Sequence, residues 1–206
     1  MMHPLLHSFT AYKLYPENVV IIISSFIPDT KVVKRLLHGR IYFGSNPTVE
    51  SVYETIEDIK ARITEDEALG IAIHLLGDLW WEENIRILFK GFSLVYRRCI
   101  ETSWAMTYLK EMYPNQGRFL YKLLKEHRTD MLEIVKRLID DVINENEVLA
   151  DITEGIEHYV DPRISFRRVI PKIEEFHEII YEKFDLDSLL SFIREHIKKS
   201  NEKRQF

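Results

Sequence analysis

Apolar residues recur at intervals of three and four along most of this chain, which is the spacing of one face of an α-helix. The segment 48–63 is typical, because Val49, Val52, Ile56 and Ile59 fall on one side of a helix and polar residues fall on the other. Only 7 Gly and 7 Pro residues interrupt the 206 positions. The pattern therefore predicts an all-α fold, a single multi-helix bundle.

The same spacing predicts where the helices lie. Pro16 is expected to end the first one, and Asp187 is expected to cap the last one. Gly39 is expected to open a loop that runs to Pro47. The expected helices cover residues 4–15, 28–38, 48–63, 65 onward, 94–112, 117–126, 130–144, 147–159, 165–183 and 188–199.

The apolar run Val19–Ile27 is rich in β-branched residues and could form either a strand or a buried helix. A second strand of similar quality is missing from the sequence, so we expect a buried helix. Thr64 and Glu67 have capping-box spacing and should begin the longest helix. This helix is apolar nearly all round, which predicts a central place in the bundle. Gly91 is expected either to end it or to let a neighbouring helix pack closely.

Composition and charge restrict the class of protein. With 28 Lys and Arg against 33 Asp and Glu, the net charge is −5, which does not favour general nucleic-acid binding. Cys99 is the one cysteine, so disulfides do not hold the fold. The most apolar run is far shorter than the ~20 residues of a membrane span. We expect one cytoplasmic domain over residues 1–199 and a polar tail over 200–206, and the scarcity of Gln indicates heat adaptation.

His74 and Asp78 are the most informative pair in the sequence. Four positions on a helix place both side chains on one face, so both could reach one metal ion. Their neighbours are apolar, and a buried aspartate needs a positive partner. The alternative is structural, in which the imidazole and the carboxylate satisfy each other or Asp78 pairs with an arginine.

Three further candidates lie in the first third of the chain. His7 lies in the first helix, Asp29 follows the apolar run and His38 closes the next helix. Each also has a structural explanation, because histidines occur at the edges of cores and charged side chains favour helix ends. As a set, they place possible ligands on three different elements.

In this order, His7, Pro28-Asp29, His38 and the segment from Gly70 to Trp80 with His74 and Asp78 resemble the zinc-dependent phospholipase C family. The resemblance covers about the first ninety residues and is closest to the prokaryotic branch, which is related in fold to P1-type nucleases. It implies an all-α bundle in which histidines and aspartates hold a cluster of metal ions.

The chain also departs from that family's pattern. In studied members the mature N-terminal amine completes one zinc site, and because this chain starts with Met1 we do not expect that ligand here. The family's later His, followed by a Glu one turn on, is also absent. Glu154 and His158 have the same spacing in reverse and could supply two more metal ligands, or they could be a surface pair.

The resemblance and the ligand types together predict a chemistry. Imidazole and carboxylate donors suit zinc or another divalent transition metal, as one or two ions. Such a site would hydrolyse a phosphoester, either a lipid or a small molecule, with Asp29 as bridging carboxylate or general base. Two pairs of arginines could clamp the phosphate, although such pairs are more often solvated. These are Arg97, Arg98, Arg167 and Arg168.

Other readings of the sequence remain open. A helical interaction protein that keeps a degenerate metal site would explain the weak second half, whereas an HD-type phosphohydrolase would need adjacent His and Asp, which the chain lacks. The aromatic-rich middle, from Trp80 to Tyr108, is expected to pack in the core. His127, His177 and His196 are expected to face solvent, and the basic C-terminal residues are expected to form an ordinary polar terminus.

Overall fold

The computed structural model describes residues 2–42, 48–139, 143–160 and 173–203, with side chains except at 38–42, 201 and 203. Within these ranges the chain forms eleven α-helices and two short 3-10 helices and contains no strand. The predicted all-α bundle is therefore confirmed, and Val19–Ile27 does not form a strand. None of the described helices is both long enough and apolar enough to cross a membrane.

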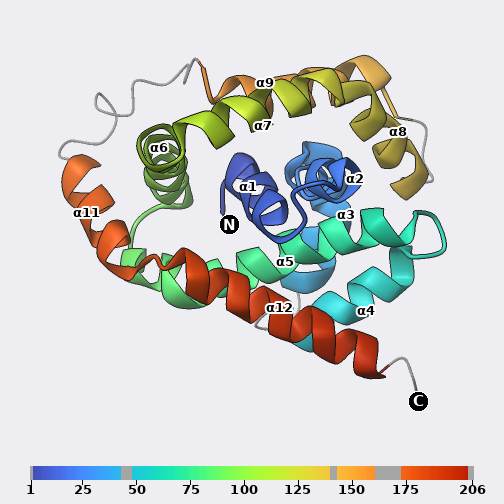
Figure 1. Cartoon of the computed structure of the whole chain (residues 1–206), viewed down its shortest axis with the longest axis horizontal. Helices are drawn as coiled ribbons and strands as arrows, with labels where there is room; N and C mark the ends of the chain where they lie inside the picture. Colours follow the sequence, from blue (N-terminus) through green and yellow to red (C-terminus); the bar gives the residue numbers. More distant parts are fainter. Residues whose placement is uncertain (1, 43–47, 140–142, 161–172, 204–206) are drawn as a thin grey trace.

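Two short helices form the centre of the bundle, and the others surround them (Figure 1). The central helices are α1 (Pro4–Leu14) and α2 (Val19–Ser24), and α5 (Glu65–Asn84) packs against both. Around them lie α3 (Lys31–Tyr42), α4 (Val49–Ile59), α6 (Leu94–Met112), α7 (Pro114–Glu126), α8 (Arg128–Leu138), α9 (Glu145–Glu157), α11 (Ile173–Lys183) and α12 (Leu186–Lys203). The 3-10 helices η1 (Ile27–Asp29) and η2 (Arg86–Phe89) join α2 to α3 and α5 to α6.

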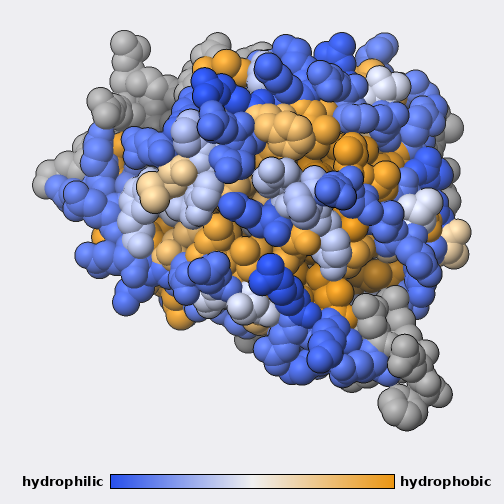
Figure 2. All heavy atoms as spheres, in the orientation of Figure 1, coloured by the Kyte–Doolittle hydropathy of each residue, from blue (hydrophilic) through white to orange (hydrophobic). Residues whose placement is uncertain are grey.

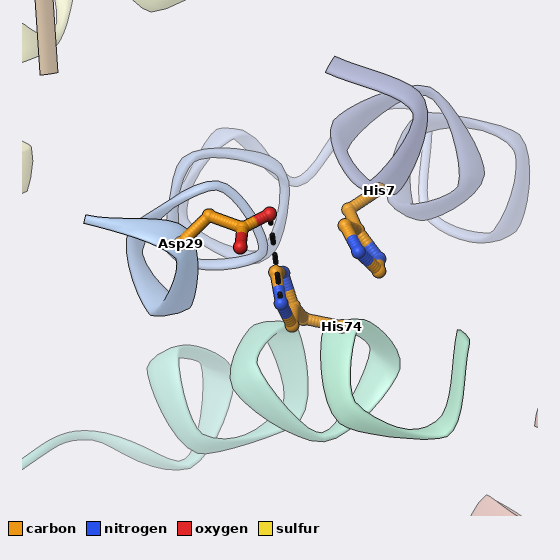
Figure 3. A group of neighbouring side chains, drawn as sticks. All are labelled: His7, Asp29 and His74. Atoms are coloured by element: carbon orange, nitrogen blue, oxygen red, sulfur yellow. Dashed lines mark ion pairs between the residues drawn. The ribbon is translucent and has the colours of Figure 1, made fainter. Parts of the chain in front are cut away.

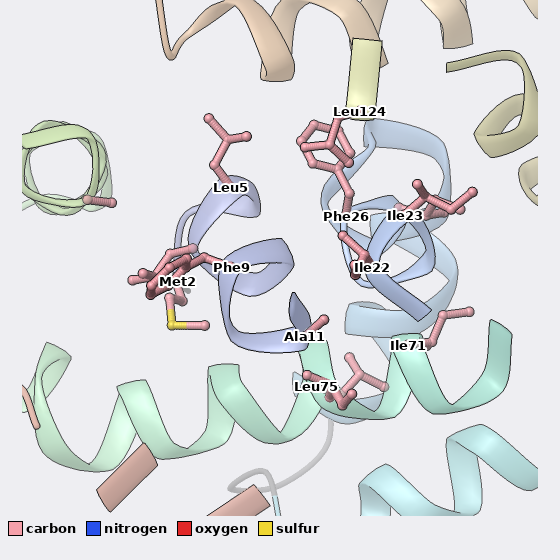
Figure 4. Packing of buried hydrophobic residues seen from close by; sticks show 14 of the residues in the cluster. Met2, Leu5, Phe9, Ala11, Ile22, Ile23, Phe26, Ile71, Leu75 and Leu124 are labelled. Atoms are coloured by element: carbon pink, nitrogen blue, oxygen red, sulfur yellow. The ribbon is translucent and has the colours of Figure 1, made fainter. Parts of the chain in front are cut away.

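α1 is central because almost every position of it can be buried. Seven consecutive residues, 5–11, are buried, and the polar ones among them are small or aromatic. Leu5 and Phe9 pack in the interior with Phe26 and Leu75 from the neighbouring elements (Figure 4). On the outside, the face in Figure 2 is mostly hydrophilic at its rim, and its apolar side chains gather mainly in the middle. The hydrophobic effect therefore holds α1 inside a ring of amphipathic helices.

Gly70 allows α2 to approach α5 closely. A Cβ atom at this position would lie 2.4 Å from the Ile21 carbonyl oxygen and 2.7 Å from Ser24 Cβ, which is closer than real Cβ contacts come. Contact at this distance brings the end of α2 against the middle of α5. It thereby brings the carbonyl of Ser25 to the helix that carries His74.

Several predicted helix boundaries are correct. α6 covers 94–112 as expected, and Thr64 and Glu67 form both hydrogen bonds of the predicted capping box at the start of α5. Thr48 caps α4 in the same way, with Ser51 as its partner. α5, with 20 residues, is the longest helix in the described part of the chain, also as expected.

The region between residues 19 and 47 differs from the prediction. The apolar run does not form one helix, because α2 ends at Ser24 and Ile27–Asp29 forms the separate η1. Pro28 therefore belongs to η1, and α3 begins only at Lys31, whose backbone N–H donates to the Asp151 carboxylate of α9. At its other end α3 runs through Gly39 to Tyr42, so the expected opening of a loop at Gly39 is wrong, and residues 43–47 lie outside the described part.

Other helix ends were also placed wrongly. α5 stops at Asn84, whose side chain donates to the Trp80 carbonyl, and not at Gly91. α8 ends at Leu138, where the Arg62 side chain donates to the last carbonyl. Asp187 lies inside α12, and its backbone N–H donates to the carboxylate of Asp185, which is the capping residue. Each of these ends is decided by a hydrogen bond that the apolar spacing does not report.

The C-terminal expectations were right in part. α12 continues to Lys203, beyond position 200 where the polar tail was expected to begin, and the expected start of the 165–183 helix falls outside the described residues. His177 is buried, contrary to expectation, because α11 packs against α6. Most of the aromatic middle packs in the core as expected, but Phe92 is exposed. Trp81 and Trp104 are fully buried, and the Trp81 indole N–H donates to Glu101.

Candidate metal centre

The middle of α5 carries His74 and Asp78 on its inner face. Both side chains are fully buried, and His74 Nε2 lies 3.6 Å from Asp78 Oδ2. The four-residue spacing therefore produces the predicted juxtaposition. Because α5 packs against α1 and α2, this face points into the centre of the bundle and not to solvent.

The orientation of the His74 ring is set by the end of α2. Its Nδ1 lies 2.8 Å from the carbonyl oxygen of Ser25. A carbonyl can only accept a hydrogen bond, so Nδ1 carries the proton and, in the neutral ring, Nε2 carries the lone pair. Metal-binding histidines commonly use this arrangement, in which the second nitrogen donates to a carbonyl and the lone pair faces the ion.

His7 projects from α1 onto the same point. Its ring stacks on the His74 ring with centroids 3.6 Å apart, and its Nε2 lies 3.2 Å from Asp78 Oδ1. The same Asp78 oxygen accepts the backbone N–H of Met2 at 2.7 Å. Asp78 thus joins the N-terminal segment to α5 and fixes the position of His7.

Asp29 reaches the cluster from η1. One carboxylate oxygen, Oδ1, accepts a charged hydrogen bond from Lys34 at 2.6 Å, and Oδ2 lies 4.0 Å from His74 Nε2. The side chains of His7, Asp29 and His74 point toward one another from three different elements (Figure 3). The structure therefore brings together four of the residues singled out from the sequence: His7, Asp29, His74 and Asp78.

The distances in this cluster suit one metal ion after a small closure. One ligand atom each from His7, Asp29 and His74 lie within 4.8 Å of one another. In a tetrahedral zinc site with bonds of about 2.0 to 2.1 Å, ligand atoms are about 3.4 Å apart. Side-chain rotations would shorten the observed separations, which are up to 4.8 Å, to about 3.4 Å. Donor types, burial and the His74 proton position all fit a divalent transition metal.

Burial and neighbouring groups together set the pKa values of His7 and Asp78. Burial, followed by the charge of His74, lowers the pKa of His7 from 6.5 to about 4, so His7 is neutral at pH 7. Burial alone would raise the pKa of the Asp78 carboxyl, but the charge and hydrogen bond of His7 and the hydrogen bond of His74 hold it well below its usual value. The centre therefore offers a neutral imidazole and an ionised carboxylate, the forms in which these groups bind metals.

A cavity of about 300 Å³ leads from solvent to the cluster. Of the four clustered residues only Asp29 lines it, so a substrate would approach from the Asp29 side. Glu154 and His158 line the same cavity but lie outside the group of three ligand atoms described above, which places them at its wall. The sequence suggested these two residues as further metal ligands or as a surface pair, and the structure does not group them with the three ligand atoms.

Three basic side chains, of Lys31, Lys34 and Arg98, and four acidic ones, of Asp29, Glu101, Asp151 and Glu154, line this cavity. Lys31 pairs with Asp151 at 3.1 Å and Lys34 pairs with Asp29. Arg98, which also lines the cavity, forms no ion pair with any residue of the described ranges. Arg98 is therefore the cation at the cavity that is available to an anionic ligand. Arg97 does not line the cavity, and Arg167 and Arg168 lie outside the described residues.

His3 is a cavity residue that the sequence reasoning missed. It caps α1, and its Nδ1 accepts the backbone N–H of Leu5 at 3.2 Å. In the neutral ring the proton is then on Nε2, so His3 can donate a hydrogen bond but is poorly suited to bind a metal. Burial, followed by the charge of His158, lowers the pKa of His3 to about 3. The sequence signal that could have identified His3 is its position directly before Pro4, the proline that begins α1.

His38 and the groups that orient the cluster differ in what the sequence predicted of them. The side chain of His38 lies outside the described part of the structure. The partners that orient the cluster, namely the Ser25 carbonyl, the Met2 N–H and Lys34, were not predicted, because two of them are backbone groups that carry no sequence signal.

Comparison with protein-family models, curated proteins and solved structures found no match to this chain. The resemblance to the zinc-dependent phospholipase C family therefore stays a prediction from the order of a few residues, and the function has to be argued from the geometry of the site.

Proposed function

We propose that this chain is a metal-dependent phosphoester hydrolase with a divalent metal, zinc by preference, at the cluster of His7, Asp29 and His74. The observation that carries the proposal is the convergence of these three buried ligand groups within 4.8 Å. The ring position of His74, with its lone pair directed toward Asp29 and Asp78, supports it. Asp78 would complete or orient the ligand set.

A metal ion held there would lower the pKa of a bound water and polarise a phosphoryl oxygen. Side chains that line the cavity could bind the phosphate oxygens and accept a proton. Arg98 can bind non-bridging phosphate oxygens, and the Nε2–H of His3 can donate to one of them. Asp29 lines the cavity and can accept a proton from the attacking water, although its hydrogen bond to Lys34 competes for one oxygen.

The first experiment measures metal binding. After equilibration with zinc and gel filtration, we expect about one or two zinc ions per chain by elemental analysis. His74→Ala should lower the zinc content at least tenfold, since the loss of one ligand has at least the effect of losing an orienting partner. The matched control is His127→Ala, because His127 is half-exposed at the junction of α7 and α8, and it should keep its zinc.

The second experiment measures activity of the zinc-loaded protein on a nitrophenyl phosphodiester, a phosphomonoester and a phospholipid. Arg98→Gln should raise KM more than it lowers kcat, because Arg98 binds phosphate and does not bind the metal. Zinc-loaded wild-type protein that cleaves none of the three substrates would contradict the hydrolase and favour the interaction protein with a retained metal site. Protein that binds no zinc would contradict the metal centre itself.

A further inference from the structure

The connection between α5 and α6 gathers exposed apolar side chains. Five of the eleven large hydrophobic side chains that are exposed in the described residues occur within nine consecutive positions, 87–95. They are Ile87, Leu88, Phe92, Leu94 and Val95, and Val95 is 69% exposed. We call this group the apolar tip. Clustered exposure of this kind marks an interaction surface, whereas single exposed apolar residues do not.

The shape of the turn keeps the apolar tip away from the core. Gly91 adopts a φ of 100°, which favours glycine, and a Cβ at this position would meet nothing within 4 Å. The turn therefore projects into open space. Behind it, Phe92 stacks on Tyr96 with ring centroids 5.3 Å apart, and both rings contact Phe176 of α11, so the tip is anchored and not loose.

The charge of this segment is opposite to that of the chain. The whole protein has a net charge of −5, yet residues 85–100 contain four basic residues and no acidic one. Arg86 is committed to a buried ion pair with Glu101. The others, Lys90, Arg97 and Arg98, form no ion pair with any part of the chain that the structure describes. Acidic residues occur on α11, which packs against α6, for example Glu174 and Glu178.

An apolar tip flanked by unpaired cations matches an anionic membrane surface. Apolar side chains can enter the acyl boundary while Lys and Arg contact anionic head groups, and aromatic rings such as Tyr96 favour the interface between them. We propose that residues 86–98 dock this protein peripherally on anionic lipid bilayers.

The docking surface is continuous with the cavity. Leu94, Arg98 and Thr102 lie four residues apart on α6 and so share one face of the helix. Arg98 and Thr102 line the cavity that leads to Asp29, while Leu94 belongs to the apolar tip. Docking would therefore bring the membrane surface close to the cavity. The docking itself does not depend on the proposed hydrolysis, because none of its residues lies in the metal cluster.

Vesicle flotation tests the proposal. The full chain is mixed with phosphatidylcholine vesicles that contain about one-third phosphatidylglycerol, and with vesicles of phosphatidylcholine alone. We expect flotation with the anionic vesicles, weaker flotation with the neutral ones, and loss of binding as salt is raised. Leu94→Ser combined with Val95→Ser should lower the partition coefficient at least tenfold, since two apolar side chains no longer insert. Lys90→Gln should lower it about fivefold on anionic vesicles only.

The control is Met112→Ser, because Met112 is similarly exposed at the opposite end of α6, about 27 Å away. It should float like wild type. His74→Ala should also float, which separates docking from the metal centre. The proposal is overturned when wild-type protein stays in the aqueous fraction, or when the Leu94/Val95 variant floats equally well. It is also overturned when that variant only abolishes self-association seen by light scattering, because the tip would then join two copies of this chain.

Discussion

His7 is a buried histidine that the folded protein keeps neutral. An imidazole in this position has lost its hydration, and the neighbouring His74, whose ring stacks on it, further lowers the pKa of His7. The Asp78 carboxylate lies 3.2 Å from His7 Nε2, and the same oxygen accepts the backbone N–H of Met2. The protonation of one residue is therefore coupled to the stability of the whole N-terminal segment.

This coupling predicts a pH dependence for the metal-free protein. The pKa of His7 is about 4 when folded and about 6.5 when unfolded, so protons favour the unfolded chain between these values. The contribution of His7 is complete above pH 6.5 and declines as the pH falls toward 4, by about 3 kcal/mol in all. Urea unfolding at pH 7 and pH 5 measures it. His3, whose pKa is lowered to about 3, acts in the same direction.

His7→Gln should reduce this pH dependence, while His127→Gln should leave it unchanged because His127 is half-exposed. A free energy of unfolding that is the same at pH 7 and pH 5 in wild-type protein would show that His7 is not held neutral by the fold.

At this scale the sequence identified the right residue types for a cluster but not their partners. His7, Asp29, His74 and Asp78 could be singled out because polar residues among apolar ones need an explanation. Glu101 could not, since nothing in its local sequence shows that Arg86 and Trp81 meet it inside the bundle. His177 was misjudged for the same reason, because charged neighbours in sequence do not show which helix lies opposite.

At the scale of the elements, the contact between α2 and α5 is the one that assembles the site. It carries the Ser25 carbonyl to His74 and leaves η1 in position to direct Asp29 toward the same ring. The absence of a side chain at Gly70 permits the approach, because a Cβ would overlap the backbone of α2. A backbone atom cannot move aside as the end of a flexible side chain can.

Gly70→Ala is therefore expected to destabilise the protein by about 3 kcal/mol, since overpacking exceeds the gain of about 1 kcal/mol from better helix propensity. It should also lower zinc affinity, because His74 loses its orienting carbonyl. Urea unfolding and zinc titration measure the two effects. Gly91→Ala provides the comparison: its positive φ costs about 1 kcal/mol, but the space around it is open and zinc binding should not change. Equal zinc affinity in both variants would contradict the role given to the α2 and α5 contact.

Element types were predictable because an apolar period of three to four residues persists through each helix. The residues at which helices begin and end were less predictable from the sequence. The 19–29 region is the clearest case, where an apolar run long enough for one helix is divided into α2 and η1, and this division turns Asp29 inward. The energy that decides it comes from packing on α5 and not from local propensity.

At the scale of the whole molecule, the site lies where three chain segments from the first eighty residues meet, and the later helices enclose it (Figure 1). Because α1, η1 and α5 contribute ligands separately, an ion bound there would join them in the folded state only. Metal binding should therefore contribute directly to global stability.

Thermal unfolding tests this consequence. Zinc at about one hundred times its Kd should add about 2.7 kcal/mol to the free energy of unfolding, which raises Tm by about 5 to 10 °C in a chain of this length. Treatment with a chelator should reverse the shift, and His74→Ala should show none. A shift of equal size in His74→Ala would mean that zinc binds elsewhere on the protein.

The sequence by itself determined the fold class, most of the helices, the buried position of α5 and the juxtaposition of His74 with Asp78, because all of these follow from spacing along one helix. Only the tertiary structure decided which of the remaining candidates join that pair. It brought His7 and Asp29 to the cluster, placed Glu154, His158 and Arg98 at the cavity wall, and added His3, which the sequence had not singled out. The physical reason is that packing between helices depends on contacts among residues far apart in the chain, and no local pattern encodes which faces will meet.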